Sequence, residues 1–224
     1  MNLVRVDTQR AYELIWDKIT TCELAPGATI DPGQLADELG MGLTSVRDAI
    51  GWLAHESLVQ VTPRHGLYVA EANLPDLDYL SEVRLLLEAQ AARLAAQRAS
   101  ADDLVVLETL RAEQAHIPAD DRHRLFDLDH KFHQAVTRAT GNKYLVQTLD
   151  HLFGLSRRLW YLALPQPGVL SSAVGQHVEL VEAIKARDSD RAERVMRGHV
   201  HDFYDRVREI LGRTLPVEGR GESG

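Results

Sequence analysis

Two short β-patterned runs interrupt a chain that otherwise reads as a succession of helices, and their position restricts the folds available. Pro63-Arg64-His65-Gly66 joins the two runs, which span residues 58–62 and 67–70. Three amphipathic helices are predicted before them, over residues 8–21, 34–39 and 43–55. Three helices followed by a β-hairpin is the order of a winged helix-turn-helix, so the sequence predicts this domain at the N-terminus of a mainly α protein.

Local signals mark where the second and third helices meet. Asp31 is a suitable cap, Pro32 suits the first helical position, and Gly40 is a suitable stop. The turn Gly40-Met41-Gly42 is short enough to link the second helix to a recognition helix that begins at Leu43. An alternative is a small α+β domain that serves as an interaction module without touching DNA.

All predicted elements after residue 76 are helical, which indicates a second, all-α domain. These helices are expected at residues 77–98, 100–116, 121–140, 143–162, 170–186 and 189–211. We therefore divide the chain into a winged helix at 1–72, a linker at 73–76, an all-α helical bundle at 77–212 and a disordered tail at 213–224.

A carboxylate and an imidazole stand one helical turn apart in the helix expected at residues 121–140. Asp129 and His133 lie at i and i+4, beside an apolar stripe that includes Leu128 and Phe132. The spacing places both polar groups on one face, where they would form half of a metal site. The plain alternative is an ordinary helix pair worth a few tenths of a kcal/mol.

The last two predicted helices supply candidates for the other half. They meet at Arg187-Asp188-Ser189, a connection that favours an antiparallel hairpin. His177 stands eleven residues before Asp188 and His199 eleven residues after it, so the two imidazoles are expected at the same height. With Asp129 and His133 they form an Asp-His-His-His set for a divalent cation, which favours Zn²⁺ and leaves Ni²⁺ or Mn²⁺ possible.

Composition and charge point to the cytoplasm. Cys22 is the only cysteine, which excludes an internal disulfide and favours a reducing compartment. No apolar run approaches the length of a membrane span. The net charge of -8 gives the chain no general attraction to nucleic acid or to anionic lipid.

Four segments of the N-terminal part carry a resemblance to a known family. They are Glu23-Leu24-Ala25-Pro26-Gly27, Leu35-Ala36-Asp37-Glu38-Leu39-Gly40, Val46-Arg47-Asp48-Ala49-Ile50 and Gly66-Leu67-Tyr68-Val69. Together they resemble the DNA-binding domain of GntR-family bacterial transcription regulators. The resemblance covers roughly residues 8–72 and implies operator DNA as a partner.

The recognition helix departs from the usual pattern of that family. The family's Ser-Arg-Thr-Pro is replaced by Gly42, Leu43, Thr44 and Ser45, so the arginine typically offered to DNA is missing. The remaining candidates for DNA contact are the side chains of Thr44, Ser45, Arg47, Arg64 and His65. Residues 1–72 carry five lysines and arginines against ten acidic residues. Such a domain is expected to bind DNA weakly or with altered base preference, and therefore to work as a homodimer.

The helical part resembles the FCD ligand-binding domain of the FadR branch of the same family. The resemblance covers roughly residues 77–211 and rests on Arg84-x3-Glu88, Asp129-x3-His133, Gly141-Asn142, His177, Ala183-Ile184-x3-Asp188 and His199. It implies that the Asp-His-His-His set holds the metal and that a small organic-acid effector binds beside it. It also suggests dimer contacts through the helix at 77–98. Arg84 is a candidate for meeting the effector carboxylate. The alternative is a salt bridge with Glu88 at the surface or at an interface.

The leading hypothesis is a metal-containing, carboxylate-responsive transcription regulator that binds a palindromic operator as a dimer, and not an enzyme. One alternative is a metallohydrolase with an appended winged helix, although the sequence lacks an HExxH motif. Another is a metal-stabilised structural module that binds no effector, which would hold a metal with no cavity beside it.

Overall fold

A computed structural model describes residues 2–64, 66–118, 120–163 and 173–214 of the chain. These residues form two compact units. The first comprises residues 1–72 together with 157–161, and the second comprises residues 73–156 and those from 162 onward. Among the described residues, no helix combines the length and the apolar character needed to cross a membrane.

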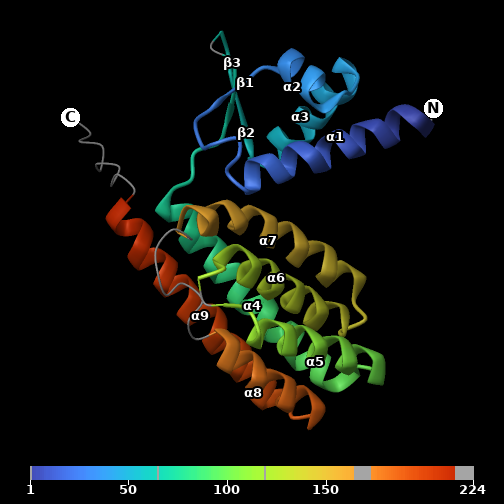
Figure 1. Cartoon of the computed structure of the whole chain (residues 1–224), viewed down its shortest axis with the longest axis vertical. Helices are drawn as coiled ribbons and strands as arrows, with labels where there is room; N and C mark the ends of the chain where they lie inside the picture. Colours follow the sequence, from blue (N-terminus) through green and yellow to red (C-terminus); the bar gives the residue numbers. More distant parts are fainter. Residues whose placement is uncertain (1, 65, 119, 164–172, 215–224) are drawn as a thin grey trace. The chain divides into compact units, whose positions relative to one another are not determined.

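The first unit has the element order of a winged helix. Its elements are α1 (Asn2–Thr20), β1 (Thr29–Ile30), α2 (Pro32–Leu39), α3 (Leu43–His55), β2 (Val59–Thr62) and β3 (Gly66–Val69). The strands form an antiparallel sheet in the order β1-β3-β2. Figure 1 shows this small sheet beside the three helices of the same unit.

The caps of α2 and α3 follow the predicted signals. The side chain of Asp31 accepts hydrogen bonds from the backbone N–H groups of Gly33 and Gln34, and Gly40 ends α2 in the left-handed conformation at φ 62°. Gly42 precedes α3 and supplies no side-chain cap. The recognition helix therefore begins without a side-chain partner for its first N–H groups.

A single apolar face joins α1 to α3. Ile15 and Ile19 of α1 are completely buried, as are Val46, Ala49 and Leu53 of α3. Their spacing of three and four residues is that of one helical face, so each helix contributes one stripe to the core.

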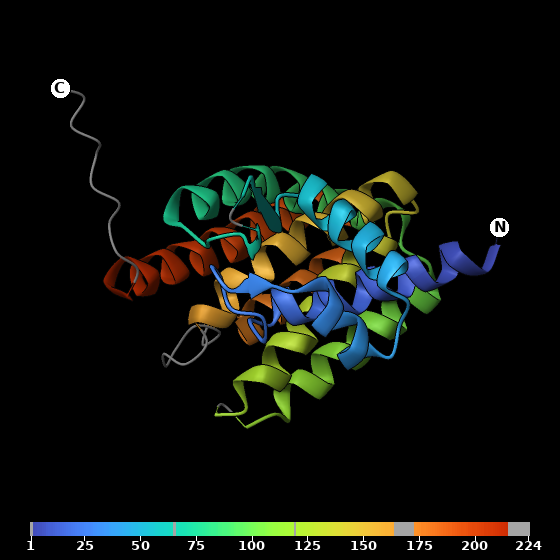
Figure 2. The same ribbon diagram turned by 90° about the horizontal axis from the view of Figure 1, so that it is seen from above.

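The second unit is entirely helical among its described residues, as the sequence predicts. Its elements are α4 (Leu74–Arg98), α5 (Ala101–Ala115), α6 (Arg122–Arg138), α7 (Lys143–Ala163) except for residues 157–161, α8 (Ala173–Lys185) and α9 (Ser189–Thr214). Helix α4 packs along α9, and α8 folds back against α9 (Figures 1 and 2). Four buried alanines of α4, which allow a neighbouring helix to approach closely, are Ala91, Ala92, Ala95 and Ala96.

The turn between α8 and α9 is fixed by contacts on both sides. Arg187 adopts φ 59° and donates hydrogen bonds to the backbone carbonyls of Ala96 and Ala99, at 3.2 and 2.7 Å. Asp188 accepts from the backbone N–H of Arg191 at 3.0 Å and so caps α9. The hairpin predicted at residues 187–189 is present, and its turn is tied to the end of α4.

Several features differ from the sequence-based expectations. Helix α1 begins at Asn2 and not at residue 8, so the expected start of the first helix is wrong. Residues 74–76, assigned to a linker, form the first turn of α4, because Asn73 caps that helix through the N–H of Asp76 at 2.8 Å. The strand β1 was not predicted. Helix α9 extends to Thr214, whereas the loop expected at residues 165–168 and most of the tail expected at residues 213–224 lie outside the described residues.

Candidate metal centre

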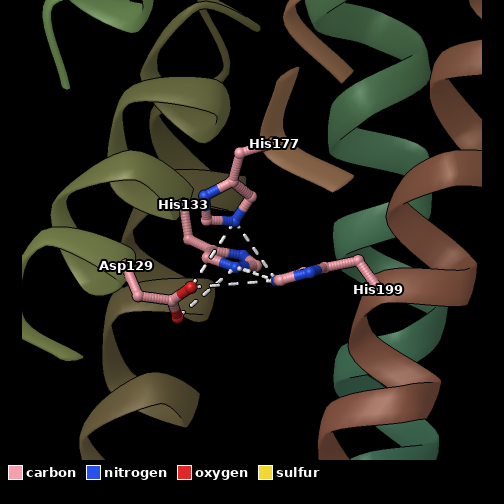
Figure 3. A group of neighbouring side chains, drawn as sticks. All are labelled: Asp129, His133, His177 and His199. Atoms are coloured by element: carbon pink, nitrogen blue, oxygen red, sulfur yellow. Dashed lines mark hydrogen bonds and ion pairs between the residues drawn. The ribbon is translucent and has the colours of Figure 1, made fainter. Parts of the chain in front are cut away.

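Four side chains of the helical unit converge on one point. Asp129 and His133 come from α6, His177 from α8 and His199 from α9, and each is at most 6% exposed. Figure 3 shows the carboxylate and the three imidazoles pointing toward one another. One ligand atom from each lies within 4.8 Å of all the others. The structure thus brings together the four residues that the helical period and the hairpin symmetry select.

The spacing of the ligand atoms suits a transition metal. The Nε2 atom of His199 lies 3.0 Å from Nε2 of His133 and 3.3 Å from Nε2 of His177. Two nitrogens that are each bound to a tetrahedral zinc at about 2.0–2.1 Å lie roughly 3.3 Å apart. The Asp129 carboxylate lies 3.5 Å from Nε2 of His177 and 3.7 Å from Nε2 of His133. One ion therefore fits between the donors with small shifts of the side chains.

The aspartate has a buried oxygen without a hydrogen-bond partner among the described residues. Asp129 Oδ1 is shielded from solvent and accepts no hydrogen bond among the described residues. Burial raises the pKa of this carboxyl group, although the nearby His133 opposes the rise. An unpartnered buried carboxylate oxygen is destabilising, and a bound cation would remove that cost.

Burial and mutual repulsion keep two of the imidazoles neutral. Burial, followed by the proximity of His199 and His133, lowers the pKa of His177 well below its usual value. Burial, followed by repulsion from His133, lowers the pKa of His199 to about 3. Neutral imidazoles are the form that binds metals.

His133 differs because it also faces a second carboxylate. Burial acts to lower the pKa of His133, but Glu88 and Asp129 raise it overall. Its Nδ1 atom is hydrogen-bonded to Oε2 of Glu88. Sequence reasoning recognised Glu88 only as a partner of Arg84 and missed its contact with His133.

Arg84 is buried inside the bundle and ion-paired with Glu88. It is 2% exposed, and its Nε atom donates to Oε1 of Glu88 at 2.7 Å. A second nitrogen donates to the hydroxyl of Tyr204 at 3.1 Å, and the guanidinium lies 4.5 Å from the centre of the Phe153 ring. Burial acts to raise the pKa of Glu88, but the nearby Arg84 and His133 lower it to about 2. The salt bridge, one of the two interpretations from the sequence, is present, but it lies in the interior and not at the surface as expected. A contact between Arg84 and an effector stays a prediction.

The predicted DNA-contact residues are divided between surface and interior. Thr44 and Arg47 are exposed on α3, and Arg64 is exposed at the turn between β2 and β3 with φ 67°. Ser45 is only 7% exposed because it continues the buried stripe of α3, so its hydroxyl is not offered to the surface as the sequence analysis expected. His65 lies outside the described residues.

The departure at Leu43 leaves an apolar side chain at the start of α3. Leu43 is 40% exposed and is the first residue of the helix. Arg47, one turn further along, is the only lysine or arginine within α3. The helix thus carries a single cation on its accessible face.

A winged helix joined to a helical domain with a buried ligand-type cluster defines a class of two-domain DNA-binding regulators. Comparison with known families gives the particular one. Residues 7–69 match the model described as bacterial regulatory proteins of the gntR family, and residues 79–202 match the FCD domain. The chain therefore belongs to the GntR family of bacterial transcription regulators, in the branch that carries an FCD domain.

Curated relatives match along nearly the whole chain. A transcriptional regulator from Streptomyces ambofaciens is 30% identical over 217 residues, which cover 94% of this chain and 89% of that protein. The transcriptional repressor RspR of Escherichia coli K12 is 26% identical over 211 residues, covering 94% and 92%. The family and these relatives are regulators and not enzymes, so the metallohydrolase alternative is set aside.

Solved structures share the fold. McbR/YncC of Escherichia coli superimposes with a TM-score of 0.80 at 21% sequence identity, over 91% of this chain and 97% of that one. A GntR regulator from Rhodococcus sp. RHA1 gives a TM-score of 0.74 at 16% identity, covering 90% and 97%. These likenesses support the architecture of an N-terminal winged helix followed by an FCD helical bundle.

Proposed function

We propose that this regulator holds a divalent metal ion in its FCD domain and binds a palindromic operator as a homodimer under the control of a small carboxylate. The observation that carries the proposal is the convergence of three Nε2 atoms and one unpartnered carboxylate oxygen at a buried point. Helical domains commonly build metal sites in this way, from side chains on facing helices. Operator DNA as the partner makes the cytoplasm the place of action.

Asp129, His133, His177 and His199 are the proposed ligands. Three imidazoles and one carboxylate favour Zn²⁺, and Ni²⁺ or Mn²⁺ are the alternatives. When bound, the ion would supply a Lewis-acidic centre for a carboxylate. The chain's own residues exclude water from the site and orient the imidazoles, because all four ligands are buried and each ring has a partner on its far nitrogen.

The proposed effector is a small organic acid that binds beside the ion. Arg84 is proposed as a contributor, on the basis of the family resemblance. Its guanidinium is already paired with Glu88, so an effector would have to share or replace that ion pair. A bound ion, for which Asp129 would be one anionic ligand, would be the second attraction for a carboxylate.

Dimerisation is proposed through the exposed face of α4. Tyr79, Val83 and Leu86 are 66%, 44% and 62% exposed, and their spacing of four and three residues puts them on one side of the helix. A second copy of the chain would bury this stripe. Pairing would also supply two winged helices for a palindromic site, which compensates for the few cations in each.

Selection from a random DNA library, followed by binding assays, tests the proposal. Protein purified without chelator is analysed for metal and incubated with the library, and the selected sequences are examined for two-fold symmetry. Affinity for the selected DNA is then measured before and after metal removal, and with a panel of small mono-, di- and tricarboxylates. A two-fold symmetric site, bound with an affinity that depends on metal and on one carboxylate, supports the proposal.

Two other outcomes contradict parts of it. Protein without metal, with DNA binding that is insensitive to every carboxylate, rejects the regulatory site. Metal without any carboxylate response identifies the ion as a structural element of the bundle, which is the remaining alternative from the sequence.

A further inference from the structure

Each imidazole of the cluster has an oxygen acceptor on the ring nitrogen that faces away from the centre. Nδ1 of His133 is paired with Oε2 of Glu88, Nδ1 of His177 with Oε1 of Gln114 at 2.7 Å, and Nδ1 of His199 with Oε1 of Gln176 at 3.0 Å. These acceptors come from three helices, α4, α5 and α8. The pattern on the outer side of the cluster is therefore the same for all three rings.

The acceptor decides which ring nitrogen carries the proton. An ionised carboxylate only accepts hydrogen bonds, so the contact with Glu88 requires a proton on Nδ1 of His133. An amide is less decisive, because it can turn either its oxygen or its nitrogen toward the ring. The orientation of the two glutamines therefore needs separate support.

For Gln176 that support is an aspartate on the neighbouring helix. The Nε2 atom of Gln176 donates to Oδ2 of Asp202 at 2.7 Å, which leaves the amide oxygen facing His199. His199 must then carry its proton on Nδ1 and present a lone pair on Nε2. Gln114 has no comparable anchor among the described residues, because its Nε2 atom is buried without a hydrogen-bond partner.

We infer that Glu88 and Gln176 are positioning residues that hold the imidazoles of His133 and His199 in the Nδ1–H tautomer and so prepare their Nε2 atoms for one cation. Asp202 acts one step further out by orienting the amide of Gln176. The inference rests on the proposed metal function and extends it to residues that never touch the ion. In metal sites generally, such outer partners fix the tautomer and the direction of the ligand.

The three acceptors differ in how well they can be tested. Removing Glu88 would leave Arg84 as a buried charge without its counter-ion, and such changes often prevent folding. Gln114 is fully buried, so truncation there opens a cavity. Gln176 is half-buried near one end of α8, and Asp202 is exposed. Gln176→Leu and Asp202→Ala are therefore the informative variants.

The same bundle contains a matched control. Gln134 of α6 donates from its Nε2 atom to Oδ1 of Asp150 on α7 at 3.0 Å, and Gln134 is half-buried like Gln176. Among the described residues, this glutamine–aspartate pair forms no hydrogen bond with an imidazole of the cluster. Gln134→Leu thus removes an equivalent interaction without altering the imidazoles.

The experiment measures Zn²⁺ affinity by competition with a chelating dye, and ring protonation by two-bond ¹⁵N–¹H correlation spectra. Gln176→Leu is expected to weaken Zn²⁺ binding about 10- to 100-fold, the usual range for outer-shell partners. The spectra of the metal-free variant are expected to show His199 as a mixture of both tautomers. Asp202→Ala should have the same effects to a smaller extent, and Gln134→Leu should bind Zn²⁺ within about twofold of the parent protein.

Two results would overturn the inference. One is a Gln176→Leu protein with the parent's Zn²⁺ affinity and an unmixed His199 spectrum. The other is an equal loss of affinity in Gln134→Leu, which would indicate general loosening of the bundle. A parent protein that binds no Zn²⁺ rejects the proposed metal function, while the ring spectra of the metal-free variants still decide whether the acceptors fix the tautomers.

Discussion

The Nε2 atoms of His177 and His199 lie 3.3 Å apart, although the two residues belong to different helices. Their separation depends on the register of α8 against α9, which the turn at Arg187 and Asp188 fixes. A slip of one residue along either helix would move an imidazole about 1.5 Å along the axis and rotate it by roughly 100°. The separation of the two imidazoles is therefore set at the turn, eleven residues from each of these two histidines.

Removal of the metal should lower thermal stability in the parent protein but not in His177→Ala. An ion present at 100 times its dissociation constant stabilises the folded state by about 2.7 kcal/mol. For a chain of this size, that corresponds to a loss of roughly 5–10 °C in Tm on adding chelator. Scanning calorimetry with and without chelator measures the difference. His201→Ala, which removes an exposed histidine of α9, should retain the full chelator effect.

Arg47→Ala should weaken DNA binding and make it less dependent on salt. Arg47 is the only cation on the recognition helix, and each lost phosphate contact reduces the slope of log K against log salt by about 0.9. Fluorescence anisotropy over a series of salt concentrations gives this slope. An unchanged slope would show that α3 does not face the DNA backbone at this position.

Leu43→Arg should have the opposite effect. The substitution adds a cation at an exposed position in the first turn of α3, so the salt slope should become steeper by about 0.9 per protomer if the new side chain reaches a phosphate. The same titration against selected and scrambled DNA shows whether the gain is specific. A slope equal to that of the parent protein would show that the side chain at position 43 does not reach a DNA phosphate.

Leu86→Glu should convert the protein to a monomer. The substitution puts a charge at one end of the exposed stripe of α4, and burying an unpaired carboxylate in an apolar contact costs several kcal/mol. Light scattering at micromolar concentration measures the mass. Val106→Glu, at a 49% exposed position on α5, is the control and should leave the mass unchanged. If both variants remain dimers, the dimer interface does not include this stripe of α4.

Ser100→Ala should destabilise the bundle by about 1 kcal/mol. The Ser100 hydroxyl accepts from the N–H of Asp103 at 3.1 Å, and the Asp103 carboxylate accepts from the N–H of Ser100 at 2.8 Å. Loss of such a cap typically costs this amount. Urea unfolding at fixed zinc concentration measures it. Thr109→Ala, on the exposed surface of the same helix, should change stability by less than about 0.5 kcal/mol.

Much of the fold was predictable because its signals are local. The caps at Asp31 and Ser100 and the stop at Gly40 depend only on residues within one turn, and the structure contains all three. The strand β1 was not predictable in the same way. Its two residues are a strand only because Thr29 and Ile30 pair with distant residues of β3.

The residues of the candidate site likewise differ in whether local sequence signals could identify them. The four candidate ligands could be selected from the helical period and from the symmetry of one hairpin, which are regular features of sequence. The outer acceptors could not, since the contact between Gln114 and His177 depends on how α5 packs against α8. The burial of Ser45 could have been predicted, because Ser45 continues the buried stripe of Ala49 and Leu53. Its polar hydroxyl group led instead to the prediction of a surface position.

The small side chains of α4 bear on which ion the site would choose. Helix α4 holds Glu88, which orients His133, and α9 holds His199, so the distance between these two helices influences how far apart two of the ligands lie. The buried alanines of α4 allow a neighbouring helix to approach closely, and a larger side chain there would increase the distance between the helices. The preference of the site for ions of one radius would then depend partly on the methyl groups of these alanines. Replacing one alanine with a larger residue would change metal preference without altering any candidate ligand.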